Sequence, residues 1–127
     1  VEFKVPSLPK NASSAYLRFI PRNEMDIAVA AASTDLVFED DKKTVKAARI
    51  AIGAVGPLPV LVEEAGAALV GTQLDESALA AAARASEKAA NPINDQRGTV
   101  EFRIHLAGVL TRRTIAIAAK RAKGEAN

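Results

Sequence analysis

Apolar and charged residues alternate at the start of the chain, where apolar positions are separated by Glu2 and Lys4. A period of two is typical of a half-buried β-strand, so we predict a short strand over residues 1–6. The next stretch, residues 7–14, is rich in Ser and carries Pro and Asn, which predicts a loop. The apolar residues at 16–20 fit either a helical turn or an irregular segment packed against the core.

Two longer stretches with the same alternation predict an antiparallel hairpin over residues 26–38 and 44–55, joined by the charged turn 39–43. The predicted faces are Ile27, Val29, Ala31 and Ser33 against Ala28, Ala30 and Ala32 in the first strand, and Val45, Ala47, Arg49 and Ala51 against Ala48, Ile50 and Ile52 in the second. We place the small residues Ala28, Ala30 and Ala32 on the face away from the core. Their apolar character indicates that a partner covers that face.

The segment 53–59 interrupts this pattern, because its two prolines remove backbone donors and fix φ. Beyond it, apolar residues recur at helical spacing, which predicts three helices over residues 61–70, 76–90 and 100–122. Gly71 is suited to end the first helix. Asp75 and Thr99 are suited to cap the N-termini of the second and third.

Strands followed by helices predict an α+β fold. We expect a two-layer sandwich in which a small antiparallel sheet of about three strands carries about three helices on one face. The sequence shows no internal repeat and no linker, so residues 1–127 are expected to form a single domain.

Composition narrows the possible functions. Aromatic residues make up 4% of the chain, so the core must be aliphatic and a base-stacking surface is not expected. Seventeen basic and fifteen acidic residues leave a net charge of +2, which argues against a nucleic-acid partner. The absence of Cys excludes disulfides and thiolate metal sites and favours a cytoplasmic location. No stretch approaches the roughly 20 apolar residues of a membrane span, so no membrane partner is expected.

His105 is the single histidine and a candidate general base. Glu101 precedes it by four residues, on the same face of the predicted helix, and could orient it. A small hydrolase that combines His105 with a Ser or Thr is therefore one hypothesis. A surface or packed histidine with a local partner is the plainer interpretation, and one histidine without cysteine argues against a transition-metal site.

Three other motifs have both a chemical and a structural interpretation. Gly53-x-x-Gly56 could cradle a phosphate, but the prolines that follow favour a turn that ends a strand. The acidic run 39–41 could bind a hard cation, but the adjacent lysines favour a solvated hairpin turn. The basic cluster of Arg112, Arg113, Lys120, Arg121 and Lys123 could contact nucleic acid, but it also complements the dipole at a helix C-terminus.

Asp95 and Arg97 lie in a turn-rich segment before the last predicted helix. They could pair with each other, cap that helix, or reach across to Arg22 and Asp26. We favour a structural polar network of these four residues over a catalytic site, because ion-pair networks produce the same clusters.

Four ordered segments resemble the C-terminal domain of the FAD-binding subunit of molybdenum hydroxylases, the family of carbon monoxide and xanthine dehydrogenases. Residues 22–28 resemble its Arg-x-x-x-Asp-Ile-Ala element, and residues 48–59 its Ala-Arg-Ile-Ala-Leu-Gly-Gly-Val-Ala-Pro-x-Pro element. Residues 64–71 resemble the helix that follows. Residues 91–103 resemble its Pro-x-x-Asp-x-Arg-Gly-Ser-Ala-Glu-Tyr-Arg motif, with Phe102 where Tyr is common.

This resemblance implies a role in electron transfer. The full enzyme would oxidise its substrate at a molybdenum cofactor in a large subunit and pass electrons through iron–sulfur clusters in a small subunit to FAD. This domain would pack beside the FAD-binding domain of its own subunit and help to dock that subunit. Arg18 matches, by its spacing to Asp26, a basic position that lies near the flavin in some relatives.

The Gly-rich loops that hold FAD in the family's preceding domain do not occur in this sequence. Together with the start at Val1, which directly begins a strand-like pattern rather than a signal peptide, this leads us to expect one domain of a longer subunit. The alternative is a free-standing docking or oligomerisation module, for example a homo-oligomer, without catalytic activity.

Overall fold

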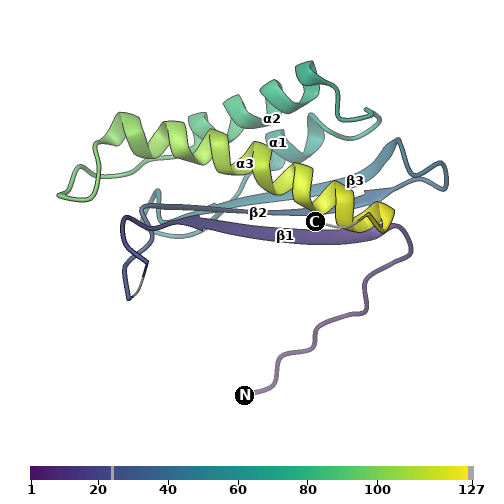
Figure 1. Cartoon of the computed structure of the whole chain (residues 1–127), viewed down its shortest axis with the longest axis horizontal. Helices are drawn as coiled ribbons and strands as arrows, with labels where there is room; N and C mark the ends of the chain where they lie inside the picture. Colours follow the sequence, from purple (N-terminus) through teal and green to yellow (C-terminus); the bar gives the residue numbers. More distant parts are fainter. Residues whose placement is uncertain (24, 126–127) are drawn as a thin grey trace.

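Four antiparallel strands and three helices make up the fold in the computed structural model, which describes residues 1–23 and 25–125. The strands are β1 (Ala12–Phe19), β2 (Ala30–Phe38), β3 (Val45–Gly53) and β4 (Val60–Leu61), and they form one sheet in that order. The helices are α1 (Glu63–Ala67), α2 (Glu76–Ala89) and α3 (Val100–Lys123). The helices cover one face of the sheet (Figure 1), so the predicted α+β sandwich is confirmed.

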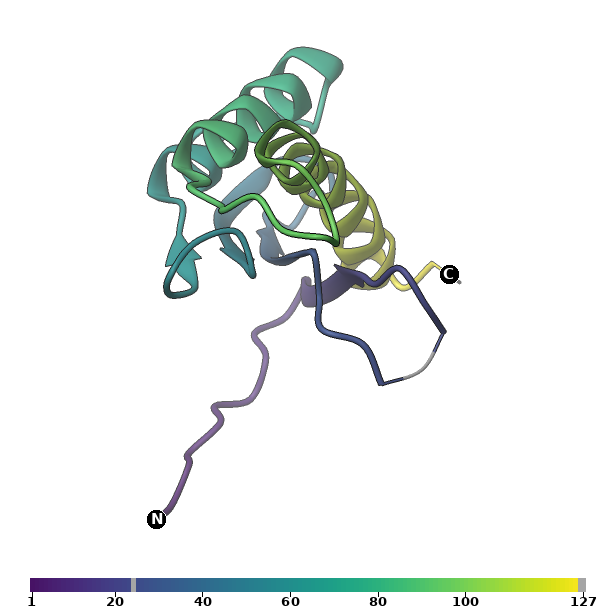
Figure 2. The ribbon, with the colours of Figure 1, turned by 90° about the vertical axis from the view of Figure 1, so that its left-hand side faces the viewer.

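The first strand lies later in the chain than predicted. Residues 1–9 form no strand and extend away from the body (Figures 1 and 2), with Val1, Phe3 and Val5 exposed. The alternatives for 16–20 are wrong and the loop predicted at 7–14 is confirmed only for residues 7–11, because β1 occupies residues 12–19. The alternation at the N-terminus has no neighbouring strand to pair with. β1 pairs along its whole length with β2, although its serines and alanines disguise its period of two.

The long hairpin is confirmed, but two of its predicted faces are wrong. β2 begins at Ala30, and its side chains at 30, 32, 34, 36 and 38 face the helices, so Ala30 and Ala32 are core residues. The bulky side chains of Leu36 and Phe38 share the parity of these alanines and decide which face is buried. Ala31 and Ser33 therefore point to the other side.

The second wrong face is that of β3, where the prediction places Val45 with Ala47, Arg49 and Ala51. A register shift between Val37 and Phe38 explains this error. The shift turns Val45 into the core, whereas the other residues of its predicted face, such as Arg49 and Ala51, remain on the far side of the sheet. The predicted interruption after Gly53 is confirmed, and the chain returns as the short β4.

The first helix is shorter than predicted because Leu61 belongs to β4 and pairs with Ala51. The prediction that Gly71 ends this helix is wrong, because α1 ends at Ala67 with Ala68 as its C-cap, and Gly71 takes the left-handed conformation, with φ of 79°, in the turn that follows. Both predicted N-caps are confirmed: the Asp75 carboxylate accepts from the backbone N–H of Ala78, and the Thr99 hydroxyl from that of Phe102. Each cap satisfies a backbone donor that the helix leaves free.

The core lies between the sheet and the helices. Its fully buried large side chains are aliphatic: Val29, Leu36, Val45, Ile50, Ile52, Leu69 and Ile115. Two hydroxyl pairs are buried in the core: Thr34 of β2 with Thr114 of α3 at 2.8 Å, and Thr111 of α3 with Ser86 of α2 at 2.9 Å. Each pair satisfies polar groups that would be costly to bury alone.

In the described part of the chain, none of the helices combines the length and the apolar character that a transmembrane segment requires.

Gly66 allows α1 to approach β3 closely, and we expect its replacement by Ala to destabilise the fold. An added Cβ would lie 2.6 Å from the Ala48 carbonyl oxygen, which is backbone and can move only with its strand. Overpacking of this kind costs about 1–3 kcal/mol. Urea unfolding of Gly66→Ala should show that loss. Gly56→Ala, whose Cβ would make an ordinary 3.7 Å contact, should stay within about 1 kcal/mol of the parent.

Candidate functional site

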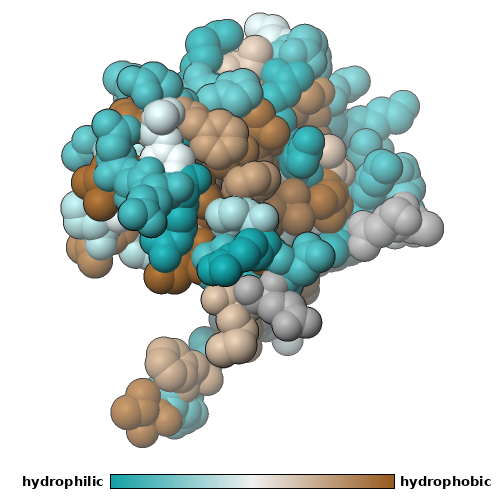
Figure 3. Space-filling view, turned by 60° about the vertical axis from the view of Figure 1, so that its left-hand side comes forward, coloured by the Kyte–Doolittle hydropathy of each residue, from teal (hydrophilic) through white to brown (hydrophobic). Residues whose placement is uncertain are grey.

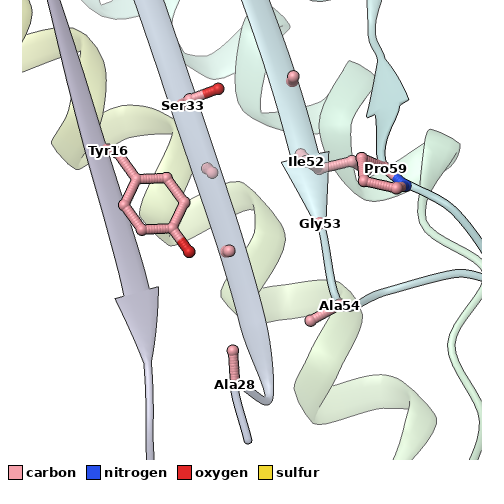
Figure 4. A pocket seen from close by; sticks show the side chains of 10 residues that line it. Tyr16, Ala28, Ser33, Ile52, Gly53, Ala54 and Pro59 are labelled. Atoms are coloured by element: carbon pink, nitrogen blue, oxygen red, sulfur yellow. The ribbon is translucent and has the colours of Figure 1, made fainter. Parts of the chain in front are cut away.

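The face of the sheet opposite the helices, which we call the open face, is hollowed near the end of β3. This open-face hollow has a volume of about 310 Å³. Figure 4 shows Tyr16 on β1 and Ser33 on β2 beside the hollow, with Pro59 beyond β3. Its other lining residues are Ala28, Ala31, Ala32, Ala51, Ile52, Gly53 and Ala54, none of which is charged. The hollow therefore presents an apolar surface with two hydroxyl groups.

Arg18 lies on the open face at the edge of this hollow. It is exposed and pairs in register with Ala31, which lines the hollow. It shares a face with Tyr16, because residues two apart in a strand point to the same side. A cation thus stands beside an otherwise uncharged surface.

A second hollow, of about 300 Å³, continues the first around the end of the sheet. The two share Ala28 and Ala54. Apolar side chains gather on this end of the molecule (Figure 3), where Ile27 and Ile93 are 66% and 72% exposed. The charged residues in the lining of the second hollow are Asp95, Arg97 and Arg103.

The four residues of the predicted polar network lie together beside this second hollow. Arg22 Nε donates to Asp26 Oδ2 at 3.2 Å, and Arg97 Nε lies 3.7 Å from Asp26 Oδ1. Arg97 also lies 3.7 Å from Asp95 Oδ2, so it bridges the two carboxylates. The resulting chain of ion pairs joins the loop after β1 to the loop before α3.

Sequence reasoning missed the buried member of this network, Arg103. The residue is only 5% exposed, and its guanidinium donates to the carbonyl oxygens of Val29 and Ala54 at 3.1 and 3.3 Å. Its Nη2 lies 2.5 Å from Asp95 Oδ2. Arg103 thus clamps the start of β2, the turn after β3 and the loop before α3. The sequence signal for a buried Arg103 was its spacing, because residues 103, 107 and 110 fall on one face of α3 and that face packs into the core.

The network holds both carboxyl groups in their ionised form. The hydrogen bond from Arg22 is the main cause that lowers the pKa of Asp26 below its ordinary value, and the bond from Arg103 does the same for the pKa of Asp95. Backbone N–H groups of Ile27 and Arg97 add to these effects. These carboxylates are therefore suited to hold cations and unsuited to donate protons near neutral pH.

The histidine, the acidic run and the basic cluster singled out from the sequence lie on α3 or in the hairpin turn between β2 and β3. His105 is exposed on α3, and its side chain forms no hydrogen bond or ion pair with Glu101 or with another described residue. Asp41 accepts from the backbone N–H groups of Lys43 and Thr44 and so orders the hairpin turn. In the basic cluster, Nη2 of Arg112 donates to both carboxylate oxygens of Glu76, at 2.6 and 2.8 Å. No cluster of metal-binding side chains occurs among the described residues.

A sequence model of the CO dehydrogenase flavoprotein C-terminal domain matches residues 15–118. The chain belongs to this family. The match spans β1 to most of α3 and includes the Arg103 clamp and the open face. The family resemblance inferred from the four segments is therefore confirmed.

Curated relatives and solved structures agree with this assignment. The medium chain of carbon monoxide dehydrogenase from Afipia carboxidovorans is 38% identical over 120 residues, and the alpha subunit of the 6-hydroxypseudooxynicotine dehydrogenase complex from Paenarthrobacter nicotinovorans is 29% identical over 123. The alignments cover 94% and 97% of this chain but only 41% of each relative. The chain therefore spans about two fifths of the length of these proteins.

Two solved structures share the fold closely. CO dehydrogenase from Oligotropha carboxidovorans superposes with a TM-score of 0.85 at 35% identity, over 92% of this chain and 40% of that one. Quinoline 2-oxidoreductase from Pseudomonas putida superposes with a TM-score of 0.80 at 32% identity, over 87% of this chain and 38% of that one.

The residues of this domain do not fit a complete FAD site. A dinucleotide pyrophosphate needs backbone donors at a Gly-rich helix N-terminus or a set of cations. The open-face hollow offers neither, because its lining is uncharged and is built from strands.

The polar network makes a testable prediction about acid stability. The folded-state pKa values of Asp26 and Asp95 are lower than the ordinary value of 3.8, so their stabilisation is complete above that pH and is lost as pH falls through the folded values. Urea unfolding of Asp95→Asn should show lower stability at neutral pH and a smaller loss on acidification than the parent. Asp40→Asn, in the exposed hairpin turn, should keep the parent's pH profile. An unchanged profile in Asp95→Asn would contradict the prediction.

Proposed function

We propose that this chain is the accessory C-terminal domain of the FAD-binding subunit of a molybdenum-dependent dehydrogenase similar to carbon monoxide dehydrogenase. In this role it supports electron transfer from a molybdenum cofactor through iron–sulfur clusters to FAD. It does so by docking, and it carries no catalytic residue of its own. The observation that supports the proposal most strongly is the family match over residues 15–118, combined with relatives more than twice as long.

The geometry of the open face supports the same role. An apolar hollow beside an exposed Tyr16 and Arg18 suits contact with the FAD-binding domain of the same subunit. The large molybdenum subunit and the small iron–sulfur subunit are further proposed partners. A cation close to the flavin would favour the reduced cofactor, which carries negative charge.

FAD retention tests the division of labour between the domains. We expect the purified 127-residue chain, mixed with FAD and passed through gel filtration, to lose the visible flavin absorbance. The full FAD-binding subunit, treated in the same way, should keep it. Stoichiometric FAD on the isolated chain would contradict the proposal, because it would require a complete flavin pocket within this domain.

Arg18 is proposed to lie near the flavin, and its removal should make the flavin harder to reduce. In the full subunit, Arg18→Gln should shift the flavin midpoint potential by about 10–50 mV toward negative values, as expected for the loss of one partly screened charge. Spectroelectrochemical titration measures this shift. Arg113→Gln, an equally exposed arginine on α3, is the matched control. Equal potentials for the parent and Arg18→Gln would remove Arg18 from the flavin's surroundings.

A further inference from the structure

The open face has the cross-section of a trough. In register across the four strands lie Tyr16, Ser33, Ala51 and Leu61, in that order. The two outer side chains are large and are 61% and 48% exposed, whereas the two inner ones are small. The neighbouring row places Ala31 and Gly53 on the same floor. Tyr16 and Leu61 therefore form walls on either side of a floor made of β2 and β3.

The trough runs along the strands rather than across them. The open-face hollow at one end and a hollow of about 230 Å³ at the other share Ser33 and Ala51, so the floor is continuous. The lining of the hollow of about 230 Å³ also includes Ser14, Asp35, Arg49 and Leu61. The trough thus passes from an uncharged floor to a polar end.

The polar end holds groups that the described chain leaves without partners. Asp35 and Arg49 face each other across β2 and β3, yet no ion pair joins them to each other or to another described residue. The Asp35 Oδ1 atom is buried and has no hydrogen-bond donor within the described residues. Buried carboxylate oxygens are normally hydrogen-bonded. A bound partner could give Asp35 Oδ1 a hydrogen-bond donor and give the Arg49 guanidinium a carboxylate with which to form an ion pair.

The dimensions of the trough favour an α-helix. Its walls stand on β1 and β4, three strand spacings apart, which is about 14 Å at about 4.8 Å per spacing. An α-helix with its side chains is about 10–12 Å in diameter. A second sheet packs poorly here, because sheet packing needs large side chains that interdigitate on both sides and this floor has none.

We propose that the trough seats one amphipathic α-helix from the FAD-binding portion of the same subunit. Large aliphatic side chains of that helix fill the space above Ala31, Ser33, Ala51 and Gly53. Its polar end provides a carboxylate for Arg49 and a hydrogen-bond donor for Asp35. Arg18, at the opposite end, stays free to face the flavin. This inference rests on the proposed function, because it takes the occupant from the subunit in which the domain is proposed to reside.

Substitutions in the trough test the inference. The 127-residue chain and the FAD-binding portion of its subunit are produced as separate polypeptides, and their association is measured by titration calorimetry. Ala51→Trp fills the floor, and Arg49→Glu reverses the charge at the polar end. We expect each to weaken association at least tenfold. Ala116→Trp and Arg113→Glu, at exposed positions of α3, are the matched controls and should bind like the parent. Circular dichroism verifies that all variants fold.

The outcomes separate this inference from the proposed function. If Ala51→Trp and Arg49→Glu both bind the FAD-binding portion as tightly as the parent chain does, the trough is not the docking site. The proposed function would then remain intact. Absence of binding by the parent chain itself would overturn both. Self-association of the isolated chain that Ala51→Trp abolishes, measured by sedimentation velocity, would assign the trough to a second copy of this chain and would also overturn the inference. If hydrogen exchange shows that complex formation protects one helix of the FAD-binding portion together with β2 and β3, the inference is supported.

Discussion

The packing of all three helices on one face of a four-stranded sheet is the constraint on which the rest of this structure depends. The bulky residues of β2 and β3, such as Leu36, Ile50 and Ile52, share one parity and therefore point to one side. Burying them beneath the helices, with α3 over β2 and α1 over β3, supplies most of the driving force for folding. The opposite face then carries the small residues Ala31, Ser33, Ala51 and Gly53, with Asp35 and Arg49 at one end. One-sided packing thus builds the core and, by the same alternation, leaves small residues along the floor of the open face.

The Arg103 clamp fixes the end of the sandwich where the hollows meet. The guanidinium is buried together with the Val29 and Ala54 carbonyl groups and the Asp95 carboxylate that it bonds. A buried cation is tolerated only when such partners are in place, so the three segments must assemble together. From Asp95 the ion pairs continue through Arg97 to Asp26. The loop after β1 is thereby tied to the helix layer.

Much of this fold follows from residue patterns, and the errors have physical causes. The caps at Asp75 and Thr99 were predictable because each depends on one side chain and the N–H groups next to it. β1 was not, since a strand on the edge of a sheet needs only one good face and can be built from small residues. The face of β2 was misassigned because residues 27–33 alone suggest the wrong parity, and only Leu36 and Phe38 correct it.

The residue patterns also explain which parts of the candidate site could be predicted from the sequence. Arg22, Asp26, Asp95 and Arg97 were recognisable as charged residues in turn-rich segments, but Arg103 was hidden in a helix. The trough could not be read from any single segment, because its walls and floor come from four strands that meet only through the register of the sheet. This sheet has a helix-covered core on one side and a floor of small residues on the other, which is the shape that the proposed docking helix requires. Asp35 and Arg49 at the polar end of that floor form no ion pair within the described residues, so the proposed docking helix can supply a hydrogen-bond donor to Asp35 and a carboxylate to Arg49.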